Sequence, residues 1–169
     1  GAAGAGTDPR SVIRVRAGKG RPRDVWSVAP GARPSGAPPR AYAELAGWLA
    51  RSIPATPARL REVERSGREV GREIAGDLAG DPATAVRDAF AALGFEPALE
   101  RGEEGFSCRL ENCPFRDAVR ENREAICGLH RGITAGILAE LDPKAELIRF
   151  EPRDPDRAGC VVEVARPRQ

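Results

Sequence analysis

The chain has 169 residues, a formal net charge of +2, 41% hydrophobic residues and 31% charged residues. This composition excludes a disordered chain and a protein that is strongly basic or acidic overall, and it suits one ordinary domain or two small ones. The chain has neither a run of about 18 apolar residues nor the charged-then-apolar order of a signal peptide, so we expect a cytoplasmic protein without membrane contact.

The first pattern along the chain predicts a β-hairpin over residues 11–16 and 24–28, because alternating apolar residues flank a turn rich in Gly and Pro. Lys19, Arg21 and Arg23 lie at the tip of this hairpin, and residues 10–23 contain no acidic side chain. Two interpretations remain open. The hairpin is a solvated surface element, or it is the wing of a winged helix whose arginines contact DNA phosphates or a narrow minor groove.

A Pro/Gly-rich linker over residues 29–39 precedes a predicted amphipathic helix over residues 40–53. Tyr42, Leu45 and Leu49 recur on one side at intervals of three and four residues. We expect this apolar side to form a homodimer interface, although packing onto the same chain would give the same pattern.

The remaining patterns alternate between helices and strands and predict an α+β fold. Pro57, Pro82 and Pro114 favour helix starts, and Gly94, Gly128 and the Asp142-Pro143 pair favour helix ends. The helices are expected at residues 57–79, 83–93, 114–126 and 130–141, and the strands at residues 95–100, 106–110, 147–150 and 160–164.

We divide the chain into a wing at residues 1–29, a linker with dimerisation helices at residues 30–80, and an α+β sensor domain at residues 81–169. Within the last helix, Gly132 and Gly136 form a smooth strip that a neighbouring backbone can approach closely.

The residues with the most distinctive chemistry are Cys113, Cys127, Cys160 and His130, the only histidine. Thiols in a reducing compartment more often bind metals or react than form structural disulfides. The lack of a CxxC pair argues against a zinc ribbon or a thioredoxin-like site, but Cys with His suits zinc or iron–sulfur chemistry. Buried, inert cysteines are the alternative, and this is the role expected of Cys108 on its strand.

One geometric difficulty stands against a shared site. A straight helix over residues 114–126 would hold Cys113 and Cys127 about 20 Å apart. A joint site therefore requires that this helix is shorter, that the chain folds back, or that a partner subunit completes it.

Two segments carry a resemblance to a known family. Residues 18–30 with residues 42–46 resemble the wing and following helix of ArsR/DeoR-like winged-helix repressors. The run Cys113-Pro114-Phe115, the run from Ile126 to Gly132 and the late Cys160 resemble the sensor half of SufR repressors of iron–sulfur cluster biogenesis. The resemblance implies that Cys113, Cys127 and Cys160 hold a [4Fe-4S] cluster, with His130 as a candidate fourth ligand and zinc as the alternative metal.

The resemblance also implies a dimeric DNA-binding repressor in which the cluster controls operator binding. The recognition helix of that family should precede the wing, and residues 1–11 leave no room for it, so we expect the C-terminal part of such a regulator, with a sensor domain that binds a cluster, a metal or a small ligand. Lys19, Arg21 and Arg23 would then contact DNA. We expect no enzymatic activity, because the spacing suggests no catalytic dyad beyond Cys127 with His130 and no phosphate-binding loop occurs. The competing hypothesis is a ligand-free dimerisation domain whose cysteines are core residues.

Overall fold

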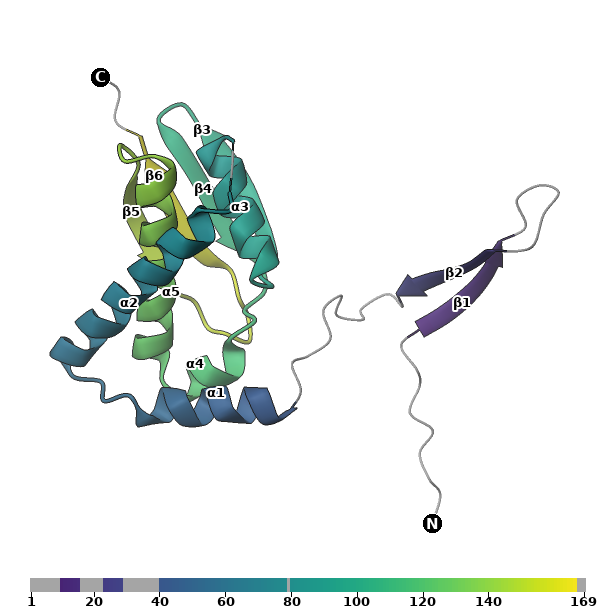
Figure 1. The fold of residues 1–169 in the computed structure, drawn as a ribbon, viewed down its shortest axis with the longest axis horizontal. Helices are drawn as coiled ribbons and strands as arrows, with labels where there is room; N and C mark the ends of the chain where they lie inside the picture. The colour runs from purple at the N-terminus through teal and green to yellow at the C-terminus, as the bar shows by residue number, and fades with distance from the viewer. Residues whose placement is uncertain (1–9, 16–22, 29–39, 79, 167–169) are drawn as a thin grey trace, which may run out of the picture. The chain divides into compact units, whose positions relative to one another are not determined.

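The structure is a computed structural model that describes residues 10–15, 23–28, 40–78 and 80–166. The chain divides into two compact units, residues 1–38 and residues 39–169. Figure 1 shows both units, and each is described separately below.

The first unit contains the predicted hairpin. β1 (Arg10–Val15) pairs antiparallel with β2 (Arg23–Val28), and Arg10 lies opposite Val28. Alternation of polar and apolar residues in both segments explains their strand structure. The expected basic tip falls partly outside the described residues: Lys19 and Arg21 lie there, and Arg23 begins β2.

The second unit contains five helices and four strands among its described residues, which confirms the α+β class. The helices are α1 (Arg40–Ser52), α2 (Pro57–Ala75), α3 (Pro82–Ala92), α4 (Arg116–Glu121) and α5 (Arg123–Leu141). The strands are β3 (Pro97–Gly102), β4 (Gly105–Leu110), β5 (Glu146–Glu151) and β6 (Cys160–Ala165).

The predicted helix starts at two prolines are confirmed, with a capping side chain before each. Thr56 accepts a hydrogen bond from the backbone N–H of Arg59 at the start of α2. Asp81 accepts one from the backbone N–H of Thr84 at the start of α3.

The four strands form one antiparallel sheet in the order β3-β4-β6-β5. Leu110, at the end of β4, lies opposite Cys160, the first residue of β6. The backbone N–H of Gly159 donates to the carbonyl oxygen of Leu110 at 2.7 Å, which closes the same end of the sheet. The chain reaches Cys113 three residues beyond Leu110, so this pairing brings Cys113 and Cys160 to one edge.

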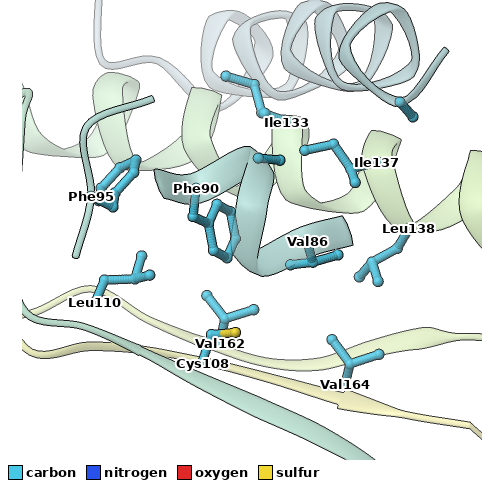
Figure 2. Packing of buried hydrophobic residues seen from close by; sticks show 12 residues of the cluster. Val86, Phe90, Phe95, Cys108, Leu110, Ile133, Ile137, Leu138, Val162 and Val164 are labelled. Carbon is cyan, nitrogen blue, oxygen red and sulfur yellow. The ribbon is translucent and has the colours of Figure 1, made fainter. Parts of the chain in front are cut away.

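The hydrophobic core lies between one face of this sheet and the helices α3 and α5 (Figure 2). Phe90 of α3, Ile137 of α5 and Val162 of β6 are completely buried. Cys108 of β4 is also completely buried, opposite Leu99 of β3 and Val162 of β6. The expectation that Cys108 is an ordinary core residue is confirmed.

α2 lies along α5 on the side away from the sheet (Figure 1). The approach is close because glycines face each other across it: Gly67 and Gly71 on α2, and Gly132 and Gly136 on α5. A methyl group at Gly132 would overlap the backbone oxygen of Glu64, and none of the four positions has room for one. The expected strip at Gly132 and Gly136 is confirmed. This contact joins α2 to the sheet-bearing unit, whereas the sequence grouped residues 57–75 with the linker.

The sequence prediction of a single helix over residues 114–126 is wrong, as is the helix end at Gly128. The chain breaks at Asn122, whose extended backbone separates α4 from α5. The Asn122 side chain accepts a hydrogen bond from the backbone N–H of Ala125 and so caps α5. α5 then continues through Gly128, because its packing against α2 and the sheet outweighs the cost of about 1 kcal/mol for an internal glycine.

Among the described residues, no helix has the length and apolarity needed to cross a membrane.

Candidate functional site

Three separate elements bring the cysteines of the predicted set together. Cys113 lies in the loop between β4 and α4, Cys127 lies in α5, and Cys160 begins β6. The break at Asn122 turns α5 away from the direction of α4, which removes the 20 Å separation that a straight helix imposes. All three side chains and that of His130 line one cavity of about 20 Å³.

This cavity is small and mostly apolar. It holds about one water-sized group, and the rings of Phe95, Phe115 and Phe150, from three separate segments of the chain, complete its wall. The loop after β5 covers one side through Pro152 and Pro155. Arg123 of α5 donates to the carbonyl oxygen of Pro152 at 2.8 Å and so ties this loop to the helix.

His130 is enclosed by aromatic rings. Its imidazole stacks on Phe95 with ring centroids 4.5 Å apart, and the rings of Phe90 and Phe150 meet it edge-on at 5.5 Å and 5.1 Å. The residue is 7% exposed, and burial lowers the pKa of His130 to about 4. The imidazole is therefore neutral at neutral pH, the form in which histidine binds metals.

The Nε2 atom of His130 is buried and has no hydrogen-bond partner among the described residues. A buried polar atom without a partner costs about 1–3 kcal/mol, and such atoms are rare in folded proteins. A ligand in the adjoining cavity would give this atom a partner.

The thiols of the cavity are held in their neutral forms. Burial raises the pKa of Cys127 to about 11, with further increases from the neighbouring Cys160 and Cys113, while Arg123 acts in the opposite direction. Burial also raises the pKa of Cys113, against a hydrogen bond from the backbone of Phe115. The mutual effect of the three sulfurs shows that they lie within electrostatic range of one another.

Cys160 has a backbone partner. The backbone N–H of Arg153 donates to its Sγ atom at 3.3 Å. Backbone N–H groups directed at a sulfur stabilise negative charge on it, which is a feature of iron–sulfur ligands. No local sequence pattern predicts this contact, because Arg153 lies in an irregular loop seven residues before Cys160.

The donor set fits a soft metal or an iron–sulfur cluster, since it offers three sulfur atoms and one unpartnered imidazole nitrogen. The ligand geometry is not yet formed: within residues 42–78 and 80–166, no three Cys, His, Asp or Glu side chains stand close enough to hold one ion. Binding therefore requires the thiols to come closer together and lose their protons, and a cluster, which is larger than a cavity of about 20 Å³, also requires the cavity to widen.

Asn122 is a residue of this region that the sequence reading missed. Its side-chain N–H groups donate to the carbonyl oxygens of Ala50 at 3.0 Å and Ile53 at 2.9 Å, while its oxygen caps α5. One side chain thus joins the end of α1 to the start of the helix that carries Cys127. The Asn-Arg-Glu-Ala sequence is typical of a helix N-cap and would have indicated a helix start here.

The second contact between α1 and the site region comes from Glu121, the last residue of α4. Its side chain lies 3.6 Å from where a Cβ atom on Gly47 would be, and its carboxylate is 3.4 Å from the Arg51 guanidinium. α1 therefore rests on the short helix that separates Cys113 from Cys127.

A larger hollow of about 450 Å³ lies away from the thiols, at the hairpin between β3 and β4. Two pairs of its charged side chains are in contact: Arg101 donates to Asp81 at 2.6 Å, and Arg166 lies 2.7 Å from the buried Asp142. Among the described residues that line this hollow, no buried side-chain nitrogen or oxygen lacks a hydrogen-bond partner, in contrast to the thiol cavity.

Comparison with known proteins assigns no family: no family model matches the chain, and no curated protein matches it.

Proposed function

We propose that the chain is the sensing part of a transcriptional regulator, in which Cys113, Cys127 and Cys160 bind an iron–sulfur cluster and the bound state controls DNA binding. The observation that carries the proposal is the convergence of these three thiols, remote in sequence, on a cavity that is also lined by His130, whose Nε2 atom has no partner among the described residues. The likeness of the cysteine-containing segments to SufR-type sensors supports a cluster over zinc.

Each residue has a distinct task in this proposal. The three cysteines supply thiolates, the Arg153 backbone stabilises charge on the sulfur of Cys160, and His130 is the candidate fourth donor. When bound, a cluster supplies sensitivity to oxygen and to iron supply. The aromatic wall limits the access of water to the site.

The path from site to DNA is proposed to run through α1. Ordering Cys113 and Cys127 around a common ligand changes the angle between α4 and α5, and the joint at Asn122 passes this change to the end of α1. α1 follows the hairpin unit in the chain, so a shift of α1 alters how the basic hairpin residues, among them Lys19, Arg21 and Arg23, are presented to DNA.

A second function is favoured by one observation. The raised pKa values of Cys113 and Cys127 are what inert core cysteines show, and this fits a ligand-free interaction domain. Iron, zinc and acid-labile sulfide analysis of anaerobically purified protein separates the two functions, because the interaction domain would contain none of them.

The test of the proposal is anaerobic reconstitution with ferrous iron and sulfide, followed by visible absorption spectroscopy. We expect a brown protein that loses its colour in Cys127→Ser. Cys108→Ala is the matched control, because that thiol lies in the core and not at the cavity. Equal absorbance in the Cys127→Ser protein would refute the proposal.

A further inference from the structure

The loop between β5 and β6, residues 152–159, covers part of the thiol cavity, and we call it the strap. Pro152, Arg153 and Pro155 of the strap line the cavity together with the three cysteines of the site. The strap is neither helix nor strand, and it lies beside α4 (Figure 1). It is therefore an irregular part of the wall, whereas Cys127 and His130 are held by a long helix.

Two arginines fasten the strap to the helices on either side of Asn122. Arg120 of α4 forms an ion pair with Asp156. Arg123 of α5 donates to the carbonyl oxygen of Pro152 at 2.8 Å. The side chains of Arg120 and Asp156 are 51% and 56% exposed, so their ion pair is weak and breaks at little cost. The strap is thus tied to both α4 and α5 by contacts that open easily.

The centre of the strap is a compact turn. The side chain of Asp154 accepts hydrogen bonds from the backbone N–H groups of Asp156 and Arg157. Its carbonyl oxygen accepts one from the backbone N–H of Ala158 at 2.8 Å. Ala158 has a φ of 54°, in the left-handed region that few non-glycine residues adopt, and Gly159 follows with a φ of 81°. Strained backbone of this kind is common at ligand clamps and switches, so we expect the turn to move as one piece about these two residues.

The closed cavity has room for about one water molecule. An iron–sulfur cluster, the ligand proposed above, is larger, so part of the wall moves when it enters. α5 is not that part, because its glycines hold it in direct backbone contact with α2. Phe95 is only 5% exposed and belongs to the hydrophobic core. The strap is fastened by exposed contacts, and segments of this kind open locally at low free energy.

We infer that the strap is the gate of the thiol cavity: it opens outward about its end next to β6 to admit a ligand, and the Arg120–Asp156 ion pair latches it shut. The inference deepens the proposed function and rests on it for the identity of the ligand. The gate itself belongs to the metal-free fold, because the contacts that fasten it are present without a ligand. Its two arginines come from the two helices that meet at Asn122, so opening the strap also releases a tie between α4 and α5.

Alkylation by N-ethylmaleimide tests the gate on the whole 169-residue chain, metal-free and reduced. This reagent is uncharged and forms a stable thioether, so a change of protein charge does not alter its local concentration and the label does not migrate. Less than one equivalent per chain prevents a first label from opening the site to a second. Cys113 is the reporter, because it lines the cavity and is only 9% exposed. Cys108 is completely buried in the core and reports global unfolding, and mass spectrometry of the peptides resolves the two thiols.

Asp156→Asn removes the latch and should speed the labelling of Cys113 about two- to fivefold, the change in open population expected from the loss of one exposed ion pair. Labelling of Cys108 should stay unchanged. Asp117→Asn is the matched control: Asp117 also pairs with Arg120, within α4, so this variant loses the same charge but keeps the latch. It should label like wild type. Equal Cys113 rates in wild type and Asp156→Asn, or an equal increase at Cys113 and Cys108, overturns the gate.

The labelling requires no cluster, so failure of the gate and failure of the proposed function are distinguishable. A chain that shows the latch effect at Cys113 but takes up no iron and sulfide on reconstitution supports the gate and refutes the proposed function. A chain that forms the cluster but labels Cys113 equally in wild type and Asp156→Asn supports the proposed function and refutes the gate.

Discussion

The buried imidazole of His130 should make the metal-free protein sensitive to mild acid. Its pKa is about 4 in the folded protein, against 6.5 for an exposed histidine. Between these two values the unfolded chain binds a proton that the folded chain excludes, so stability is complete above pH 6.5 and is lost as the pH falls toward 4. A difference of 2.5 pKa units corresponds to about 3 kcal/mol at 1.36 kcal/mol per unit.

Urea denaturation followed by circular dichroism, in the presence of a chelator, measures this contribution at several pH values. His130→Phe keeps an aromatic ring among Phe90, Phe95 and Phe150 and removes the titrating group. Carboxylates titrate in both proteins, so their effect cancels in the difference between the two unfolding free energies. Wild type should lose about 3 kcal/mol relative to His130→Phe between pH 7.5 and pH 4. Parallel pH profiles for the two proteins would refute the account of a buried, unpartnered imidazole.

Three further predictions follow from individual contacts. Gly132→Ala should lower the free energy of unfolding by about 1–3 kcal/mol, because the added methyl group would overlap the α2 backbone. Gly128→Ala on the same helix is the control: its methyl group would meet no atom within 4 Å, so this variant should be as stable as wild type or more stable. Denaturant titration measures both. Asn122→Ala should lower the free energy of unfolding by about 2–3 kcal/mol and increase amide hydrogen exchange in α1. Asn122→Ser can still cap α5, so it should lose less stability, but hydrogen exchange in α1 should increase as much as in Asn122→Ala. In the metal-free protein, alkylation of Cys127 by iodoacetamide should be slow at neutral pH and accelerate toward its pKa of about 11; a rate that levels off near pH 8.5 would show an ordinary thiol.

Local sequence patterns predicted most of the second unit. Alternation, periodicity and proline placement act over a few residues and were enough to predict the four strands and the helix starts at Pro57 and Pro82. The prediction for residues 114–128 was wrong, because the residue pattern there is compatible with one continuous helix and Gly128 is a residue type that often ends a helix. Long-range packing of α5 on α2 decided that segment.

Only part of the candidate site could be predicted from the sequence. The residue types alone indicated soft metal ligands at Cys113, Cys127, Cys160 and His130. Their convergence depends on strand pairing between Leu110 and Cys160 and on the turn at Asn122, which join positions far apart in sequence. The aromatic enclosure of His130 comes from α3, the segment before β3, and β5, and no local pattern could have predicted it.

Native mass spectrometry under anaerobic conditions tests the central claim, a ligand held jointly by three remote thiols, most directly. After reconstitution, the account predicts one mass increment equal to an iron–sulfur cluster per chain, lost in Cys113→Ser, Cys127→Ser and Cys160→Ser and retained in Cys108→Ala. An increment that persists in the three serine variants, or that never forms in the wild-type chain, would contradict it.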